Sequence, residues 1–119
     1  MLNWFRPKWK HSNADVRKAS LAEIKDPAIL VEVIIGDSEW FIRHDAMAVL
    51  RAMQPDESHY HRLMRESGDE EIRRKVVKVM ADENELQRVA ENDKYRYIRD
   101  AAEHRLAELR TGMWDDIES

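Results

Sequence analysis

One short pattern recurs four times along the chain and constrains its fold more than any other feature. Each copy has an apolar residue, then an arginine, then a small or aliphatic residue three positions after the arginine and an apolar residue seven positions after it. The arginines that mark the copies, at nearly regular intervals, are Arg17, Arg43, Arg73 and Arg99. Apolar positions with this spacing share one face of a helix. A short regular repeat of this kind is typical of an array of stacked helical units.

A second apolar pattern lies upstream of the last three arginines. Each of these arginines is preceded, at the same two distances, by apolar residues: Leu30, Tyr60 and Leu86 at the larger distance, and Val33, Leu63 and Val89 at the smaller. The two positions are three apart and lie on the same helix face. Each copy therefore predicts a pair of helices, and one pair buries its apolar stripe only by packing on its neighbours.

The first two copies also align with the last two when Arg17 is placed on Arg73. The same shift brings together, among others, Asp37 with Asp93, Ile42 with Ile98 and Arg43 with Arg99. We infer a duplicated double unit, and we call this superposition of the two halves the duplication alignment. In it the second and fourth copies carry two extra residues, which are expected to place Phe41 and Tyr97 just before their helices.

At these residues the chain resembles the HEAT-repeat family, in its short-period, PBS-lyase-like variety. The resemblance covers roughly residues 13–110. It implies an all-α superhelix (solenoid) of about four short helix pairs. It also implies that the four marker arginines are structural and that each pairs with an aspartate of a neighbouring pair. The candidate aspartates are Asp26, Asp37, Asp56, Asp69, Asp82 and Asp93. We expect a single repeat domain over residues 1–112, in which residues 1–12 form an N-terminal cap, and an acidic tail over 113–119.

Capping residues predict where the helices begin and end. Asn13, Asp26, Asp56 and Asp82 are expected N-caps, and Pro27 suits the first position of a helix. Glycine and asparagine are common at left-handed helix ends. Such ends are expected at three places: Gly36, Gly68 and Asn92. In the cap, Trp4 is expected to cover the open end of the core.

The composition limits the cellular compartments and the classes of partner to be expected. The 119 residues include no cysteine, which excludes disulfides and thiolate metal sites. No apolar run approaches the length of a membrane span, and the N-terminus has no signal-peptide core. We therefore expect a cytoplasmic protein. The net charge of −4 argues against a dedicated nucleic-acid binder, because such domains are usually basic.

The sequence offers no combination of residues for catalysis, a metal or a cofactor. His59 and His61 are two positions apart and point to different sides of a helix. The HEAT-like deoxyhypusine hydroxylases hold iron through His-Glu dipeptides, and this chain has none. With three glycines in all, it also lacks a phosphate-binding loop. We expect no enzyme activity.

The outward positions of the marker helices are the expected partner-binding surface. Basic and aromatic residues gather there or beside it: Lys18, Trp40, His44, Arg74, Lys75, Lys78 and Tyr95. Exposed aromatic residues beside cations are common at interface hot spots. The prediction is a non-catalytic interaction module or scaffold for an acidic protein, with no membrane contact, as a monomer or weak homo-oligomer. Two alternatives stay open, namely a nucleic-acid-binding accessory domain and an accessory subunit of a lyase or cofactor-handling enzyme.

Overall fold

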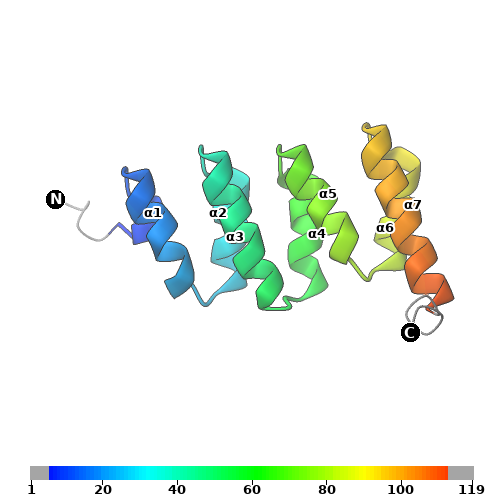
Figure 1. Ribbon diagram of the computed structural model, residues 1–119, viewed down its shortest axis with the longest axis horizontal. Coiled ribbons are helices and arrows are strands. Elements are labelled where there is room, and N and C mark those ends of the chain that lie inside the picture. Colours follow the sequence, from blue (N-terminus) through cyan, green and yellow to red (C-terminus); the bar gives the residue numbers. More distant parts are fainter. Residues whose placement is uncertain (1–5, 113–119) are drawn as a thin grey trace. The chain divides into compact units, whose positions relative to one another are not determined.

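The computed structural model describes residues 6–112, and this range is all-α, as the periodicity predicts. It contains seven α-helices and two short 3₁₀ helices (Figure 1). The α-helices are α1 (Ala14–Ser20), α2 (Pro27–Gly36), α3 (Trp40–Ala52), α4 (Glu57–Glu66), α5 (Glu70–Val79), α6 (Glu83–Asn92) and α7 (Arg96–Thr111); the 3₁₀ helices are η2 (Lys8–Lys10) and η3 (Leu21–Glu23). Residues 1–5 of the expected cap, including Trp4, and the whole expected tail lie outside the described residues.

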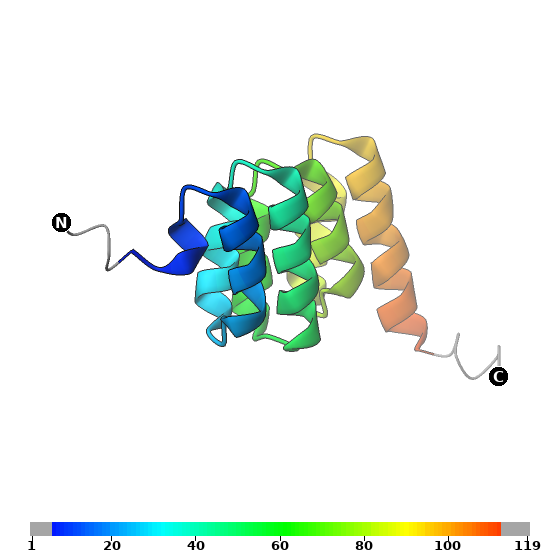
Figure 2. The ribbon, with the colours of Figure 1, turned by 60° about the vertical axis from the view of Figure 1, so that its left-hand side comes forward.

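The chain divides into two compact units, Met1–Gly68 and Asp69–Ser119. In the first unit α2 packs against α3 and α4, and α1 packs against α3 (Figure 2). In the second unit α7 packs against both α5 and α6. Every one of these contacts joins helices that are close in sequence. The expectation of a single domain over residues 1–112 stays a prediction.

The four marker arginines share one position, the fourth residue of a helix. Arg17, Arg43, Arg73 and Arg99 hold this place in α1, α3, α5 and α7. The backbone N–H of each donates to the carbonyl oxygen of its N-cap residue at 3.0 or 3.1 Å. The repeated pattern therefore marks a helix start, where the same backbone geometry recurs.

The placement of the extra residues before the second and fourth marker helices was wrong. Phe41 and Tyr97 are the second residues of α3 and α7, not part of the preceding turns. Residues 37–39, 67–69 and 93–95 form three turns of equal length. The longer spacing between Arg43 and Arg73 arises instead at the end of α3, which has 13 residues where α5 has 10, and in the following turn 53–56, which is one residue longer than the turn 80–82.

The predicted N-caps are confirmed, whereas the predicted left-handed helix ends are wrong. The side chains of Asn13, Asp26, Asp56 and Asp82 accept backbone N–H groups of the first helical turn. Within residues 6–112, only Gln54 and Gly112 have a positive φ. After α2 the chain is extended at Asp37, with φ −69° and ψ 136°. Its carboxylate accepts the N–H of Glu39 at 2.9 Å, so the turn needs no left-handed residue.

The positions that the pattern marks as apolar form the core. The residues before the last three arginines (Ile42, Ile72 and Ile98) and those at the upstream positions (Leu30, Tyr60 and Leu86; Val33, Leu63 and Val89) are all buried. Val16 is the exception and is half-buried. In the described part of the cap, Trp9 lies half-buried in η2.

Candidate interaction surface

In the first unit, one aspartate joins the start of α1 to the start of α3. The guanidinium of Arg17 donates two hydrogen bonds to the Asp37 carboxylate, at 2.9 and 3.2 Å. The carbonyl oxygen of Asp37 accepts a hydrogen bond from Arg43 at 2.9 Å. Because the Asp37 side chain is only 4% exposed, its charge depends on Arg17 for compensation. We call this set of three residues the first clamp.

The second unit repeats these contacts at the corresponding positions of the duplication alignment. The guanidinium of Arg73 donates to the Asp93 carboxylate, and Arg99 donates to the Asp93 carbonyl oxygen at 2.6 Å. The same carboxylate accepts the N–H of Tyr95 at 3.0 Å. The Asp93 side chain is 2% exposed. Arg73, Asp93 and Arg99 form the second clamp.

The clamps give the marker arginines a structural task. The hydrogen bond with Asp37, aided by the nearby charges of Asp37 and Glu39, raises the pKa of Arg17 above its usual value. The Arg17 side chain is 13% exposed and also donates to the carbonyl oxygens of His11 and Ser12. A guanidinium satisfied in this way has little left to offer an external phosphate or carboxylate.

An aromatic group lies on the outer side of α1 and α3, at the N-terminal end of α3. Trp40 is 66% exposed. Its ring meets those of Phe41 and His44 edge-on, with centroids 6.1 and 6.2 Å apart. From α1, the ammonium of Lys18 lies 5.8 Å from the Phe41 ring centre and 3.8 Å from the Asp45 carboxylate. We call these five residues the aromatic patch.

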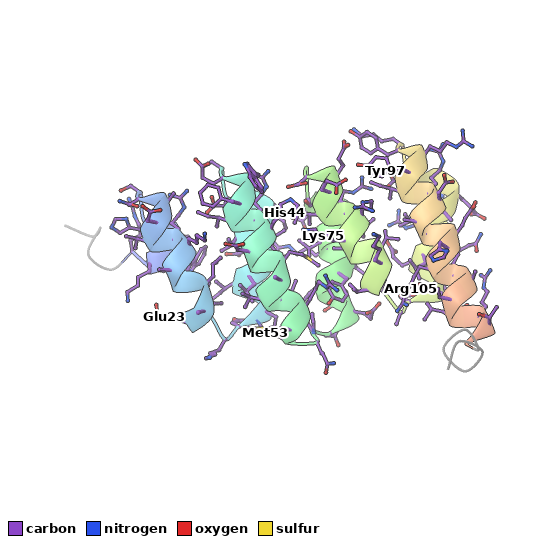
Figure 3. All side chains as sticks on the ribbon, in the orientation of Figure 1. Glu23, His44, Met53, Lys75, Tyr97 and Arg105 are labelled. Carbon is purple, nitrogen blue, oxygen red and sulfur yellow. The ribbon has the colours of Figure 1, made fainter. Side chains whose placement is uncertain are left out.

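The structure brings together three of the seven residues predicted for partner binding. Lys18, Trp40 and His44 all belong to the aromatic patch; the side chain of His44 is drawn in Figure 3. Sequence reasoning missed Phe41 as a member of the patch, because it was assigned to the preceding turn. Its position two before the marker arginine, next to Trp40, is the signal that would have found it.

The basic residues predicted on α5 belong to the second unit. Arg74 forms a 3.3 Å ion pair with Glu71 one turn earlier. Lys75 is half-buried and Lys78 is exposed. Arg74 and Lys78 lie on the side of α5 away from its buried residues Ile72, Val76 and Val77, and Lys75 lies at the edge of that side.

Tyr95, the seventh predicted residue, lies beside a second tyrosine in the second unit. The rings of Tyr95 and Tyr97 are 5.9 Å apart, and Lys94 lies 5.0 Å from the Tyr95 ring centre. Tyr97 is hydrogen-bonded to Glu70 at the start of α5. Loss of water around the phenol, that hydrogen bond and the negative charges nearby raise the pKa of Tyr97 to about 12. This pair therefore links α7 to α5 within the unit.

Within the described residues, no group of three or more histidine, aspartate or glutamate side chains is placed to hold a metal ion. No helix in this part of the chain is long and apolar enough to cross a membrane. No family model, curated protein or solved structure matches the chain.

Proposed function

We propose that this protein is a non-catalytic protein-interaction module built as a short HEAT-like solenoid, acting in the cytoplasm, and that the aromatic patch is its docking surface. The observation that carries the proposal is Trp40, whose side chain is the most exposed large apolar group in residues 6–112. A tryptophan on the surface contributes little to the core. At an interface, by contrast, a rigid indole buries a large area and is a frequent hot spot.

The surroundings of Trp40 support a partner with apolar and acidic groups. Phe41 and His44 contact the indole edge-on, which limits the side-chain entropy lost on binding. Lys18 stands beside them as a cation, 55% exposed and held by a 3.8 Å contact with Asp45. A partner that covers the indole could therefore also pair an acidic side chain with Lys18.

The test uses one variant of the patch and one matched variant elsewhere. Trp40→Ala removes the indole. Arg96→Ala truncates the residue that corresponds to Trp40 in the duplication alignment, whose side chain is 85% exposed. Tagged wild-type protein and both variants are used to capture proteins from native cell extract, with and without nuclease. Candidates identified by mass spectrometry are then purified and titrated by calorimetry.

We expect one protein that binds wild type and Arg96→Ala equally and binds Trp40→Ala at least tenfold more weakly, since hot-spot truncations cost about 2 kcal/mol or more. Equal affinities for Trp40→Ala and wild type would contradict the proposed surface. Captured material that disappears with nuclease, and whose affinity falls steeply with salt, would favour nucleic-acid binding instead.

A further inference from the structure

The last two helices of the described chain, α6 and α7, pack side by side (Figure 1). A groove with a volume of about 470 Å³ lies between them. Ala90, Leu106 and Ala107 supply its apolar lining, and Ala107 is exposed. Two charged side chains of α7, Glu103 and Arg110, belong to the same lining. The groove therefore combines a small apolar centre with charges of both signs.

The corresponding face of the first unit indicates what kind of element fits here. The duplication alignment pairs Gln87 and Ala90 of α6 with Val31 and Ile34 of α2. In the first unit α4 packs against α2, and both Val31 and Ile34 are fully buried. This face thus accepts a packed helix. The polar Gln87 suits a helix that binds reversibly, because permanent interfaces are the more hydrophobic ones.

The groove side of α7 is electrostatically complementary to itself. Glu103, Ala107 and Arg110 are separated by four and three residues, so they lie on one face of the helix. The midpoint between Glu103 and Arg110 falls between Leu106 and Ala107. If two such helices pack antiparallel about that midpoint, each glutamate lies opposite the arginine of the other copy. The small side chain of Ala107 then allows the two helices to approach closely.

We propose that the groove binds a second copy of this chain, with the two α7 helices antiparallel across a two-fold axis. A two-fold contact uses the same patch on both copies, as this charge pattern requires. Glu103 is exposed and forms no ion pair within residues 6–112. Arg110 contacts Glu83 and Gln87 of its own chain at 3.2 Å, and its side chain is 55% exposed. Because a guanidinium has five N–H donors, Arg110 keeps donors for the second carboxylate.

The size of the contact indicates a weak dimer. Stable interfaces bury about 1,600 Å² in total, and one helix pair from each copy is expected to bury less. Each exposed ion pair also adds little. The dimer should therefore form only at high protein concentration. The inference is independent of the proposed partner surface, since it uses no residue of the aromatic patch.

Charge reversal tests the pairing. Analytical ultracentrifugation over a wide range of protein concentration measures the dimer dissociation constant of the full chain, of Glu103→Arg, of Arg110→Glu and of the variant with both changes. Each single reversal turns two attractive contacts into two repulsive ones, so we expect the dimer to weaken about tenfold or more. The double variant again has opposite charges across the axis and should dimerise like the wild type.

Glu108→Arg on the same helix is the matched control, because it changes the net charge as Glu103→Arg does. Its side chain is 45% exposed and lies outside the groove lining, so the dissociation constant should not change. Circular dichroism establishes that each variant is folded. A wild-type chain that stays monomeric at every concentration would overturn the proposal, as would a double variant that dimerises no better than the single ones. Species larger than a dimer would also overturn it, because a two-fold contact closes after two copies.

Discussion

The two compact units share their buried polar contacts and differ in what they show to solvent. The first clamp joins Arg17, Asp37 and Arg43, and the second joins the corresponding residues in the same way. In both, the carboxylate accepts a guanidinium and a backbone N–H while the carbonyl oxygen accepts the second arginine. One aspartate thereby fixes the starts of two helices and the turn between them.

The outward positions of the corresponding helices differ between the two units. The duplication alignment pairs Trp40 with Arg96, Ala19 with Lys75, Ala22 with Lys78 and Ala48 with His104. At these four positions the first unit has small apolar side chains and an exposed indole, whereas the second has arginine, lysine and histidine; elsewhere on these helices the first unit has the charged residues Lys18 and Asp45. Buried polar groups tolerate few alternatives, because each must keep its partners. The outward residues need not keep such partners. Residues that differ between the two units at these positions are therefore the better candidates for binding.

The largest expected effect tests whether the clamps are equivalent. Asp37→Ala and Asp93→Ala should each lower the free energy of unfolding by about 3 kcal/mol, since each leaves a largely buried guanidinium without its counter-charge. Urea denaturation followed by circular dichroism measures both. Glu66→Ala is the control, because its pair with Arg62 is exposed on both sides and should contribute less than about 1 kcal/mol. A loss at Asp93 no larger than the control would show that the two clamps differ in strength.

A smaller loss of unfolding free energy is expected from a contact that only the second unit makes. Arg105 on α7 donates to the carbonyl oxygen of Met80 at 2.8 Å, just past the end of α5; its side chain is labelled in Figure 3. The corresponding residue of the first unit, Val49, cannot make this bond. Arg105→Met keeps most of the packing and should cost about 1.5 kcal/mol, the low end for a hydrogen bond from a charged group.

The control for that change is Arg110→Met. The Arg110 side chain is 55% exposed and pairs with Glu83 at the surface. Its removal should cost less than about 1 kcal/mol. Equal unfolding curves for Arg105→Met and Arg110→Met would show that the link from α7 to the end of α5 adds no stability.

These contacts also show which features the sequence could predict. Helix starts and buried positions follow from local spacing and capping, and they were found at Asp26, Asp56 and Asp82. Which aspartate pairs with each arginine depends on contacts between residues that are distant in the sequence, and six aspartates were candidates. Asp26, Asp56, Asp69 and Asp82 each cap the helix that begins directly after them. Asp37 and Asp93 come directly after a helix and three positions before the next, a place that would have distinguished them.

The helix ends and the patch were harder to predict. A glycine in the sequence indicates freedom to adopt a positive φ, not that the chain uses it, and Gly36 and Gly68 do not. Trp40 was predicted at the rim of the surface, but its contacts with Phe41 and His44 depend on where α3 begins. That boundary was placed too late in the chain, and so the first turn of the helix was missed.

A pH titration should separate the units through Phe41 and Tyr97, which occupy corresponding positions. Folding raises the pKa of Tyr97 to about 12 from the usual 10.0, so the native state holds this proton more tightly. The associated stability is present below pH 10 and is lost as the pH rises toward 12. Phenolate absorbance should show a tyrosine that titrates near pH 12, and Tyr97→Phe should remove that step. Burial also raises the pKa of Tyr60, so Tyr60→Phe is the control and should leave the step near pH 12 in place. A Tyr97→Phe variant that keeps the step near pH 12 would assign that step to another tyrosine.

The smallest expected effect completes the comparison, because it separates binding from stability. Trp40→Ala and Arg96→Ala should each change the free energy of unfolding by no more than about 0.5 kcal/mol, as substitutions of exposed residues usually do. Both side chains project from the first position of a helix, α3 or α7, and neither is in a clamp. Thermal unfolding measures both. If Trp40→Ala were clearly destabilising while Arg96→Ala was neutral, the indole would be supporting α1 and α3 through Phe41 and Lys18. Its exposure would then be a consequence of packing, and the case for a docking surface in the first unit would lose its main observation.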